Sequence, residues 1–387
     1  MLPLSYVLLV LQLTAVAISE TLIVQLNPET SFTSFEQKYV SLFKGSAFDK
    51  VQIGSIKAII GDFNLNMQKS IYFDKSVLSI NSDADLQMCE VQSFAPRHLV
   101  RLSQMNPIHK RQKMNFKFEM LNPVNIYILD TGINSKHPDF TNRVEVRKPS
   151  SKIYDDTGSY EDPIGHGTAV ASVIGSQLLG VCKNCNLVSY QILNDLGQGK
   201  LKNLIIALTD IYHSEKRGTI VMPFTTPRSE LLNDILHEMR VSNFTLVGAA
   251  GNLNDDACKY SPASSVDVLT VGSIDSTTDT IAKFSNYGPC VDIFADGINI
   301  ITLNNDNELL KLRSGTSLSA GITAGLVATF LGLNEVIDGE SNFDAIKKIK
   351  NTAIENRIKP QEFFKETKTP NRILHNYSGN LKSAFRN

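Results

Sequence analysis

The chain has 387 residues, of which 42% are hydrophobic and 20% are charged. These are the proportions of an ordinary globular protein, and the length accommodates one large domain with a small one, or two to three average domains. The formal net charge of -1 gives no reason to expect nucleic acid or a charged membrane surface as a partner. The sequence also shows no internal repeat of the kind that builds solenoids.

The first 19 residues carry no charged side chain and are mostly apolar. The apolar run is short and Ala15-Val16-Ala17 offers small residues for cleavage, so residues 1–19 are predicted to be a signal peptide rather than a membrane anchor. The segment has no Lys or Arg, and the alternative is a buried N-terminal strand or helix. No later segment is apolar enough to cross a bilayer, so we expect no membrane span in the mature protein.

Residues 20–90 are predicted to form a small α+β unit, because strand-like and helix-like patterns alternate along them. The expected elements are a strand at Thr21–Leu26, a helix at Ser34–Phe43, a strand within Ile53–Phe63 and a helix followed by a strand within Ser70–Ile80. Residues 91–123 include a basic, polar stretch that ends near Lys117. Such a composition is typical of a linker, so residues 91–123 are predicted to hold a processing linker and the N-terminal segment of the mature protein.

Residues 124–387 show a different pattern, in which buried strands alternate with helices. This alternation predicts an α/β domain, with a mostly parallel central sheet and helices on both faces. The expected strands are Val124–Leu129, Leu187–Leu193, Thr219–Met222, Thr245–Ala249 and Val268–Val271, and the expected helices are Leu201–Glu215, Leu231–Val241 and one beginning at Thr316. Reactive groups gather at the carboxyl ends of such strands, where Asp130 and Asn252 lie.

Four short motifs carry candidate catalytic residues: DTGI at 130–133, GHGT at 165–168, AAGN at 249–252 and SGTS at 314–317. A serine hydroxyl needs a base to become a nucleophile, and a neutral histidine can take its proton and later give it to a leaving amine. A carboxylate holds the histidine tautomer, while an asparagine amide can stabilise an oxyanion. Taken singly, Asp130, His166, Asn252 and Ser317 are as easily turn or capping residues. Their order and spacing favour one catalytic site.

These motifs, in the chain order Asp, His, Ser, resemble the subtilase family, and most closely its fungal proteinase K and cerevisin branch. The similarity runs from about residue 92 to residue 378. It implies a subtilisin-like fold and a monomeric serine endopeptidase that acts on proteins or peptides through an acyl-enzyme on Ser317. A degenerate subtilase with a structural or binding role in an extracellular matrix or cell wall is the rival hypothesis. Secretion, the cell wall and the vacuole all remain open as destinations.

Residues 20–90 also resemble the propeptide of this family. The resemblance implies a zymogen whose own propeptide assists folding, inhibits the enzyme and is removed by self-cleavage near residues 88–92. A permanent N-terminal domain is the alternative.

In this family the substrate is held as an extra strand between two enzyme segments. Gly197 and Gly199 match one of these segments. The other departs from it, because Pro223, Phe224 and Thr225 stand in a run that is usually Ser-Leu-Gly-Gly. Proline removes a backbone donor and threonine adds bulk, so we expect a narrowed specificity and weaker peptidase activity.

The resemblance further implies a disulfide between Cys258 and Cys290, restraining the loop after Asn252. Cys182 and Cys185 are expected to form a local disulfide or to remain free thiols, and Cys89 is left over. Catalysis is expected to need no cofactor. Two sequons, at Asn243 and Asn376, are candidate glycosylation sites.

The same branch of the family has a structural calcium site. Asp292, with the backbone carbonyls of Val266 and Val268, matches its ligands, and oxygen-only ligation suits calcium.

Overall fold

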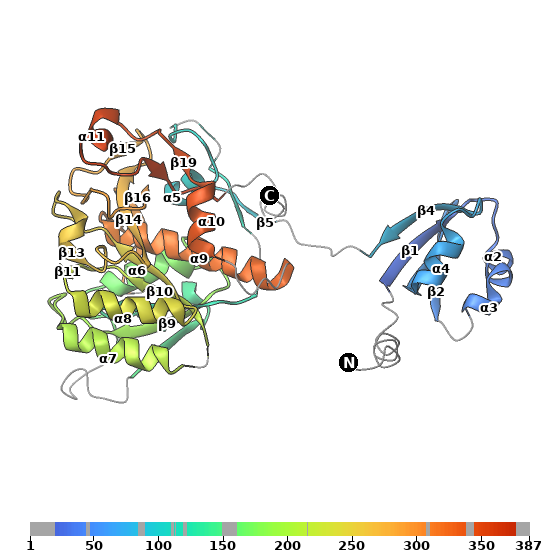
Figure 1. Cartoon of the computed structure of the whole chain (residues 1–387), viewed down its shortest axis with the longest axis horizontal. Coiled ribbons are helices and arrows are strands. Elements are labelled where there is room, and N and C mark those ends of the chain that lie inside the picture. Colours follow the sequence, from blue (N-terminus) through green and yellow to red (C-terminus); the bar gives the residue numbers. More distant parts are fainter. Residues whose placement is uncertain are drawn as a thin grey trace, which may run out of the picture. The chain divides into compact units, whose positions relative to one another are not determined.

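The computed structural model describes residues 20–43, 47–83, 90–109, 112, 114–118, 122–148, 161–214, 216–306, 310–337 and 344–376. The predicted signal peptide and Cys89 lie outside these ranges. The chain divides into two compact units, Met1–Gln87 and Met88–Asn387 (Figure 1).

The first unit is the expected α+β unit, built on a four-stranded antiparallel sheet in the order β2-β3-β1-β4. Leu22, Val24 and Leu26, alternate residues of β1, point into the core of this unit. There they pack with phenylalanines of the helices. The helix expected after Ser70 lies earlier, because Asn64 caps it by accepting hydrogen bonds from the amides of Asn66 and Met67. The elements are β1 (Glu20–Leu26), α2 (Phe32–Lys38), α3 (Val40–Phe43), β2 (Phe48–Ile53), β3 (Ile56–Phe63), α4 (Leu65–Ile71) and β4 (Val77–Ser82).

The second unit has a mostly parallel central sheet, in the order β19-β20-β16-β14-β12-β10-β7-β9-β8, with β15 paired to β14. Its edge strands β15 and β19 pair antiparallel, and the inner strands pair parallel. The strands are β7 (Asn125–Asp130), β8 (Val144–Arg147), β9 (Asn186–Gln191), β10 (Gly218–Met222), β12 (Thr245–Ala249), β14 (Val268–Asp275), β15 (Thr280–Ile281), β16 (Ile293–Asp296), β19 (Ile354–Glu355) and β20 (Arg372–Ile373).

Side chains of each inner strand alternate between two apolar cores, one on each face of the sheet. In β7, Ile126 and Ile128 join the core that contains α6 (His166–Gly175) and α9 (Thr316–Ile337). Tyr127 and Leu129 point the other way, toward α7 (Leu201–Tyr212) and α8 (Glu230–Val241). The prediction of a parallel sheet with helices on both faces is therefore confirmed.

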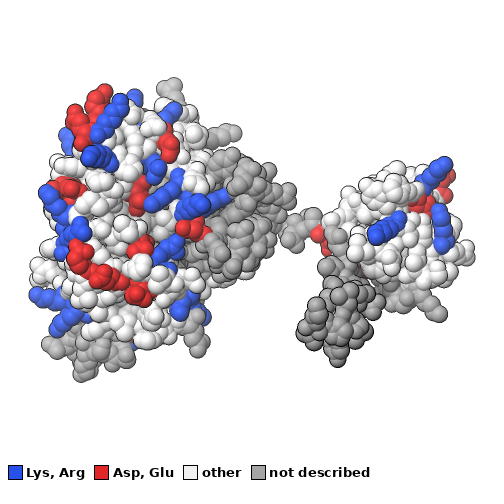
Figure 2. All heavy atoms as spheres, viewed as in Figure 1, with Lys and Arg blue, Asp and Glu red and all other residues white. Residues whose placement is uncertain are grey.

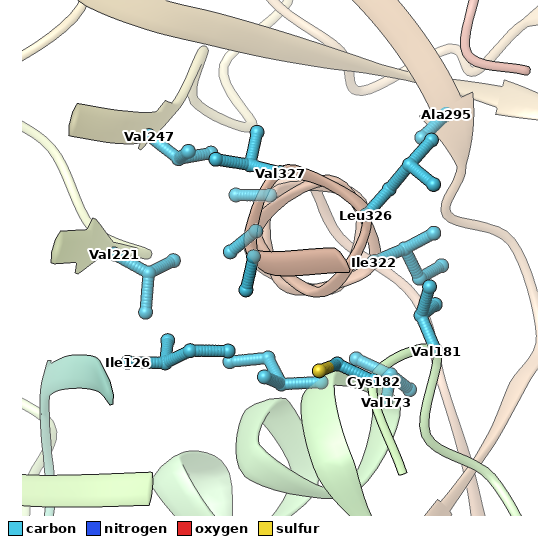
Figure 3. Packing of buried hydrophobic residues seen from close by; sticks show 14 of the residues in the cluster. Ile126, Val173, Val181, Cys182, Val221, Val247, Ala295, Ile322, Leu326 and Val327 are labelled. Carbon is cyan, nitrogen blue, oxygen red and sulfur yellow. The ribbon is translucent and has the colours of Figure 1, made fainter. Parts of the chain in front are cut away.

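Helix α9 runs through the larger core (Figure 3). Val327 points toward β12, Leu326 toward β16 and Ile322 toward the loop that follows α6, so the middle of α9 is packed on several sides. Within the described part of the chain it is the one helix long and apolar enough to cross a bilayer, over Thr316–Leu333, but 83% of that stretch is buried inside the protein.

Residues 91–123 were predicted to be a processing linker and the N-terminal segment of the mature protein, and part of their described stretch is folded into the larger unit. Helix α5 (Arg97–Leu102) packs into the larger core, with Leu99 fully buried. The positive charges that suggested exposure are neutralised inside the fold: Arg101 pairs with Asp279 at 3.0 Å, and Arg97 pairs with Asp296. Two short strands, β5 (Glu90–Gln92) and β6 (Phe116–Phe118), also pair with each other in this unit.

The remaining elements are short and lie in connections between the strands and helices already named. They are a 3-10 turn at Pro138–Phe140, β11 (Thr226–Pro227), a 3-10 turn at Ala257–Lys259, β13 (Tyr260–Ser261), β17 (Ile300–Leu303), β18 (Leu310–Arg313), α10 (Ala345–Thr352) and α11 (Gln361–Glu366). On the face shown in Figure 2, acidic and basic side chains are interspersed over the larger unit. That face therefore carries no extended field of one sign.

Candidate active site

Asp130 and His166 meet at the carboxyl edge of the sheet. Asp130 is the last residue of β7, and His166 opens α6, whose N-cap Gly165 has φ +80 and leads the chain sharply into the helix. The Nδ1 atom of His166 lies 2.7 Å from Oδ1 and 2.9 Å from Oδ2 of Asp130. The carboxylate is buried and also accepts the backbone N–H of Thr131 at 2.6 Å. This pairing fixes the ring so that its other nitrogen faces away from β7.

A second carboxylate, that of Asp162, braces the loop before α6. It is buried and accepts the backbone N–H of Gly165 at 2.8 Å and of Thr168 at 2.7 Å. It also accepts the hydroxyl of Thr131 at 2.7 Å, which joins the loop to the end of β7. None of the four motifs contains Asp162. The signal that could have found it is an acidic residue shortly before a helix start, where a carboxylate satisfies otherwise unpaired N–H groups.

Ser317 and Asn252 lie together at the start of α9 and after the end of β12. The Oδ1 atom of Asn252 accepts the backbone N–H and the hydroxyl of Thr316, both at 2.9 Å. These two bonds orient the amide, so that its Nδ2 atom remains available as a donor beside Gly315. The Ser317 hydroxyl donates to the carbonyl of Pro223 at 2.7 Å. Its hydrogen must therefore turn from Pro223 toward His166 before the imidazole can take it.

The pKa of His166 is raised above the ordinary histidine value, chiefly by the charge of Asp130. Burial opposes this effect, and the charge of Asp162 adds to it. Arg313 has the opposite influence, because a second positive charge nearby disfavours imidazolium. The site thus stabilises imidazolium while leaving the ring partly exposed, as a residue that alternately takes and gives a proton requires.

The two segments expected to hold a peptide border one groove of about 330 Å³. Gly197, Gly199, Phe224 and Thr225 all line it, and Ile192 contributes to its apolar surface. Pro223 lies at the end nearest Ser317, to which its carbonyl is bonded. The structure therefore brings together the sequence-predicted groups of both segments.

The profile of the subtilase family matches residues 122–378, more than half of the chain. The chain belongs to the subtilase family.

Among its relatives is the subtilase-type proteinase RRT12 of Saccharomyces cerevisiae, 33% identical over 85% of this chain and 69% of that protein. Proteinase T of Parengyodontium album is 33% identical over 70% of this chain and 92% of the relative. A crystal structure of a cold-adapted subtilisin-like serine proteinase is 29% identical, with a TM-score of 0.63, and covers 73% of this chain and 99% of that chain. The protein is thus a serine-type endopeptidase of this family.

One wall of the subtilase cleft is crowded by Thr225. A Cβ placed on Gly251, next to Asn252, would lie 3.2 Å from the Cγ2 atom of Thr225. The threonine methyl thus reaches across toward the segment that ends β12.

Two disulfides are formed, Cys258–Cys290 and Cys182–Cys185. The first ties the turn after Asn252 to the segment that leads into β16. The second closes the Cys-x-x-Cys loop that follows α6, so the alternative of free thiols at these two positions is not realised.

The donors expected for calcium do not fit that ion. The Oδ1 atom of Asp292 lies 2.7 Å from the ammonium of Lys350, and its Oδ2 atom accepts the backbone N–H of Thr270 at 2.9 Å. The expected donors were the Asp292 carboxylate and the backbone carbonyls of Val266 and Val268. Lys350 of α10 thus supplies the positive charge at the one carboxylate among them. Within the described ranges no three His, Cys, Asp or Glu side chains gather as a metal site.

The two sequons differ in geometry. Asn243 is exposed in the turn between α8 and β12, with φ 66, and can carry a glycan. The expectation for Asn376 does not fit, because this residue is buried and its amide donates to the hydroxyl of Ser103 at 2.9 Å. A glycan on that nitrogen would have to break the bond and leave the interior.

Proposed function

We propose that the protein cleaves peptide bonds through an acyl-enzyme on Ser317, with His166 as general base and acid, Asp130 as its orienting carboxylate and Asn252 in the oxyanion hole. The observation that carries this proposal is the pair of contacts from Asp130 to the His166 ring, at 2.7 and 2.9 Å, beside a helix start that presents Ser317.

The proposed reaction gives each of these groups one step. His166 takes the proton of Ser317, whose oxygen adds to the peptide carbonyl. The Asn252 amide and the Ser317 backbone N–H stabilise the resulting oxyanion, to which the N-terminus of α9 adds a favourable dipole. His166 then protonates the leaving amine, and the C–N bond breaks. Water, activated by the same ring, releases the acyl group and restores Ser317.

The cleft favours a small side chain on the residue that precedes the scissile bond. An extended peptide that lies between Gly199 and Thr226 presents alternate side chains to the enzyme. The methyl group of Thr225 narrows the space beside Gly251, and this supports exclusion of large aromatic residues. No metal or organic cofactor is needed for these steps.

Processing and location complete the proposal. The separate α+β unit, whose described elements run from β1 to β4, is proposed to be an inhibitory propeptide, and residues 1–19 a signal peptide. The two disulfides support an oxidising compartment, and Asn243 offers an exposed sequon. The mature enzyme is proposed to act as a monomer outside the cell or in its wall, with the vacuole as the alternative destination.

A fluorophosphonate probe tests the proposal, because it reacts only with an activated serine. We expect the purified mature protein to be labelled and to hydrolyse a mixed peptide library. The Ser317→Ala variant should lose both the labelling and the release of the N-terminal unit. Folded wild-type protein that is neither labelled nor active would instead support a binding role for a degenerate subtilase.

A further inference from the structure

Arg313 lies beside the catalytic histidine although no motif includes it. It ends β18, opposite Ile300 of β17, four residues before Ser317. Its Nη2 atom donates to the carbonyl of Ile164 at 3.4 Å. A Cβ placed on Gly165 would lie 3.0 Å from the same nitrogen, so the guanidinium rests against the residue that precedes His166.

This guanidinium has no carboxylate partner within the described part of the chain. Its Nε atom is buried there without a hydrogen-bond partner. Asp130 is bonded to His166, and Asp162 is engaged by backbone N–H groups and Thr131. Asp306, in the same region, accepts the side-chain amide of Asn304 at 2.6 Å. Partial burial of an unpaired cation is costly, so a bound carboxylate would be stabilised here.

The mechanism decides which part of a substrate reaches Arg313. His166 must protonate the leaving amine, so the chain after the scissile bond has to pass beside the imidazole. The residues before that bond lie in the groove lined by Gly199 and Thr225, and neither Gly165 nor Arg313 borders this groove. Arg313 therefore faces the leaving part of the substrate, and Thr225 faces the acyl part.

We propose that Arg313 is a specificity-determining residue that selects an acidic side chain in the residue directly after the scissile bond. Aspartate or glutamate there can accept charge-assisted hydrogen bonds from the guanidinium, whose several donors lie in one plane, an arrangement that lysine does not offer. The inference rests on the proposed peptidase function and assigns to it a class of substrate.

The test compares quenched fluorescent peptides that differ only at the residue after the scissile bond, which is Asp, Asn or Lys. We expect kcat/KM to fall in that order, by about tenfold from Asp to Lys. The negative charge of Asp attracts the Arg313 guanidinium, and the positive charge of Lys repels it. High salt should reduce the difference. Arg313→Gln should give similar kcat/KM values for the three peptides, and Arg313→Glu should reverse their order.

Lys311 provides the matched control, since it lies on the same strand and is exposed. Lys311→Gln should retain the wild-type order of the three peptides. Equal kcat/KM for Asp and Lys in the wild type overturns the role of Arg313 and leaves the peptidase function standing. An absence of cleavage of every peptide overturns the peptidase function itself, and this inference with it. The wild-type series decides the matter even if a variant at Arg313 does not fold.

Discussion

The carboxylate of Asp162 accepts the hydroxyl of Thr131 at 2.7 Å, and that hydroxyl oxygen accepts the backbone N–H of Gly167 at 3.0 Å. This chain of two bonds joins the end of β7 to the start of α6. The two elements approach so closely that a Cβ on Gly167 would lie 2.0 Å from the carbonyl oxygen of Gly132. The distance from Asp130 to His166 is therefore set by contacts outside the triad.

Replacing Asp162 by Asn should lower kcat/KM by about 10- to 100-fold, because an amide cannot accept at both positions and charge-assisted bonds are lost. The acid limb of the pH profile should also move. The negative charge of Asp162 helps to raise the pKa of His166, so its removal favours the neutral ring and shifts the limb to lower pH. Glu161→Gln, at the exposed neighbouring position, is the control. An unmoved limb would show that His166 does not sense this charge.

Substitution of Asn252 by Ala should reduce kcat by about 10²- to 10³-fold with little change in KM, since the lost donor acts on the oxyanion of the transition state. Thr316→Val tests the orientation of that donor. It removes one of the two bonds to the Asn252 Oδ1 atom, and also the acceptor of the Gly251 backbone N–H, and should lower kcat by about five- to tenfold. A Thr316→Val enzyme as impaired as Asn252→Ala would mean that the threonine acts in another way.

The sequence patterns predicted the sheet well where strands are buried on both faces. The expected strand at Thr245–Ala249 coincides with β12 residue for residue. A short run of small and β-branched residues between polar turns favours a buried strand over a helix. The proposed triad and Asn252 could be predicted for a related reason. Each lies within two residues of a glycine at a sharp turn or a close approach, so a short local motif marks each position.

Contacts between distant parts of the chain left no such signature. Arg101 reads as a solvent-exposed charge, yet it is buried against Asp279, which is 178 residues away in sequence. Lys350 likewise has nothing in its neighbourhood to indicate Asp292. Asp162 was missed because its partners are mostly backbone N–H groups, which are the same for every residue type. These features follow from the packing of the whole domain.

The pairing of Lys350 with Asp292 predicts a fold that does not depend on calcium at this position. Lys350→Met should lower the free energy of unfolding by about 1 kcal/mol, since both side chains are partly exposed and solvent screens the pair. Lys347→Met, at an exposed position of the same helix, is the control. A chelator should leave the melting temperature of the wild type unchanged. A clear drop would show that a metal ion binds after all.

Two buried histidines predict that the protein is destabilised by mild acid. Burial lowers the pKa of His98 to about 4, and its Nε2 donates as a neutral ring to the carbonyl of Leu179 at 2.8 Å. His375 is lowered to a similar value, first by burial and then by the charge of Arg101. In the unfolded chain the pKa of a histidine side chain is about 6.5. Stability from these rings is therefore complete above that pH and is lost as the pH falls toward 4.

For His98 alone the loss between pH 7 and pH 5 amounts to about 2 kcal/mol. His98→Leu should reduce the acid sensitivity by that amount in urea unfolding followed at both pH values. The quantity to compare is the change in the free energy of unfolding between the two pH values. The variant also leaves the Leu179 carbonyl without its donor, which lowers stability equally at every pH. A variant as sensitive to acid as the wild type would place the titrating group elsewhere, with His375→Leu as the next position to measure.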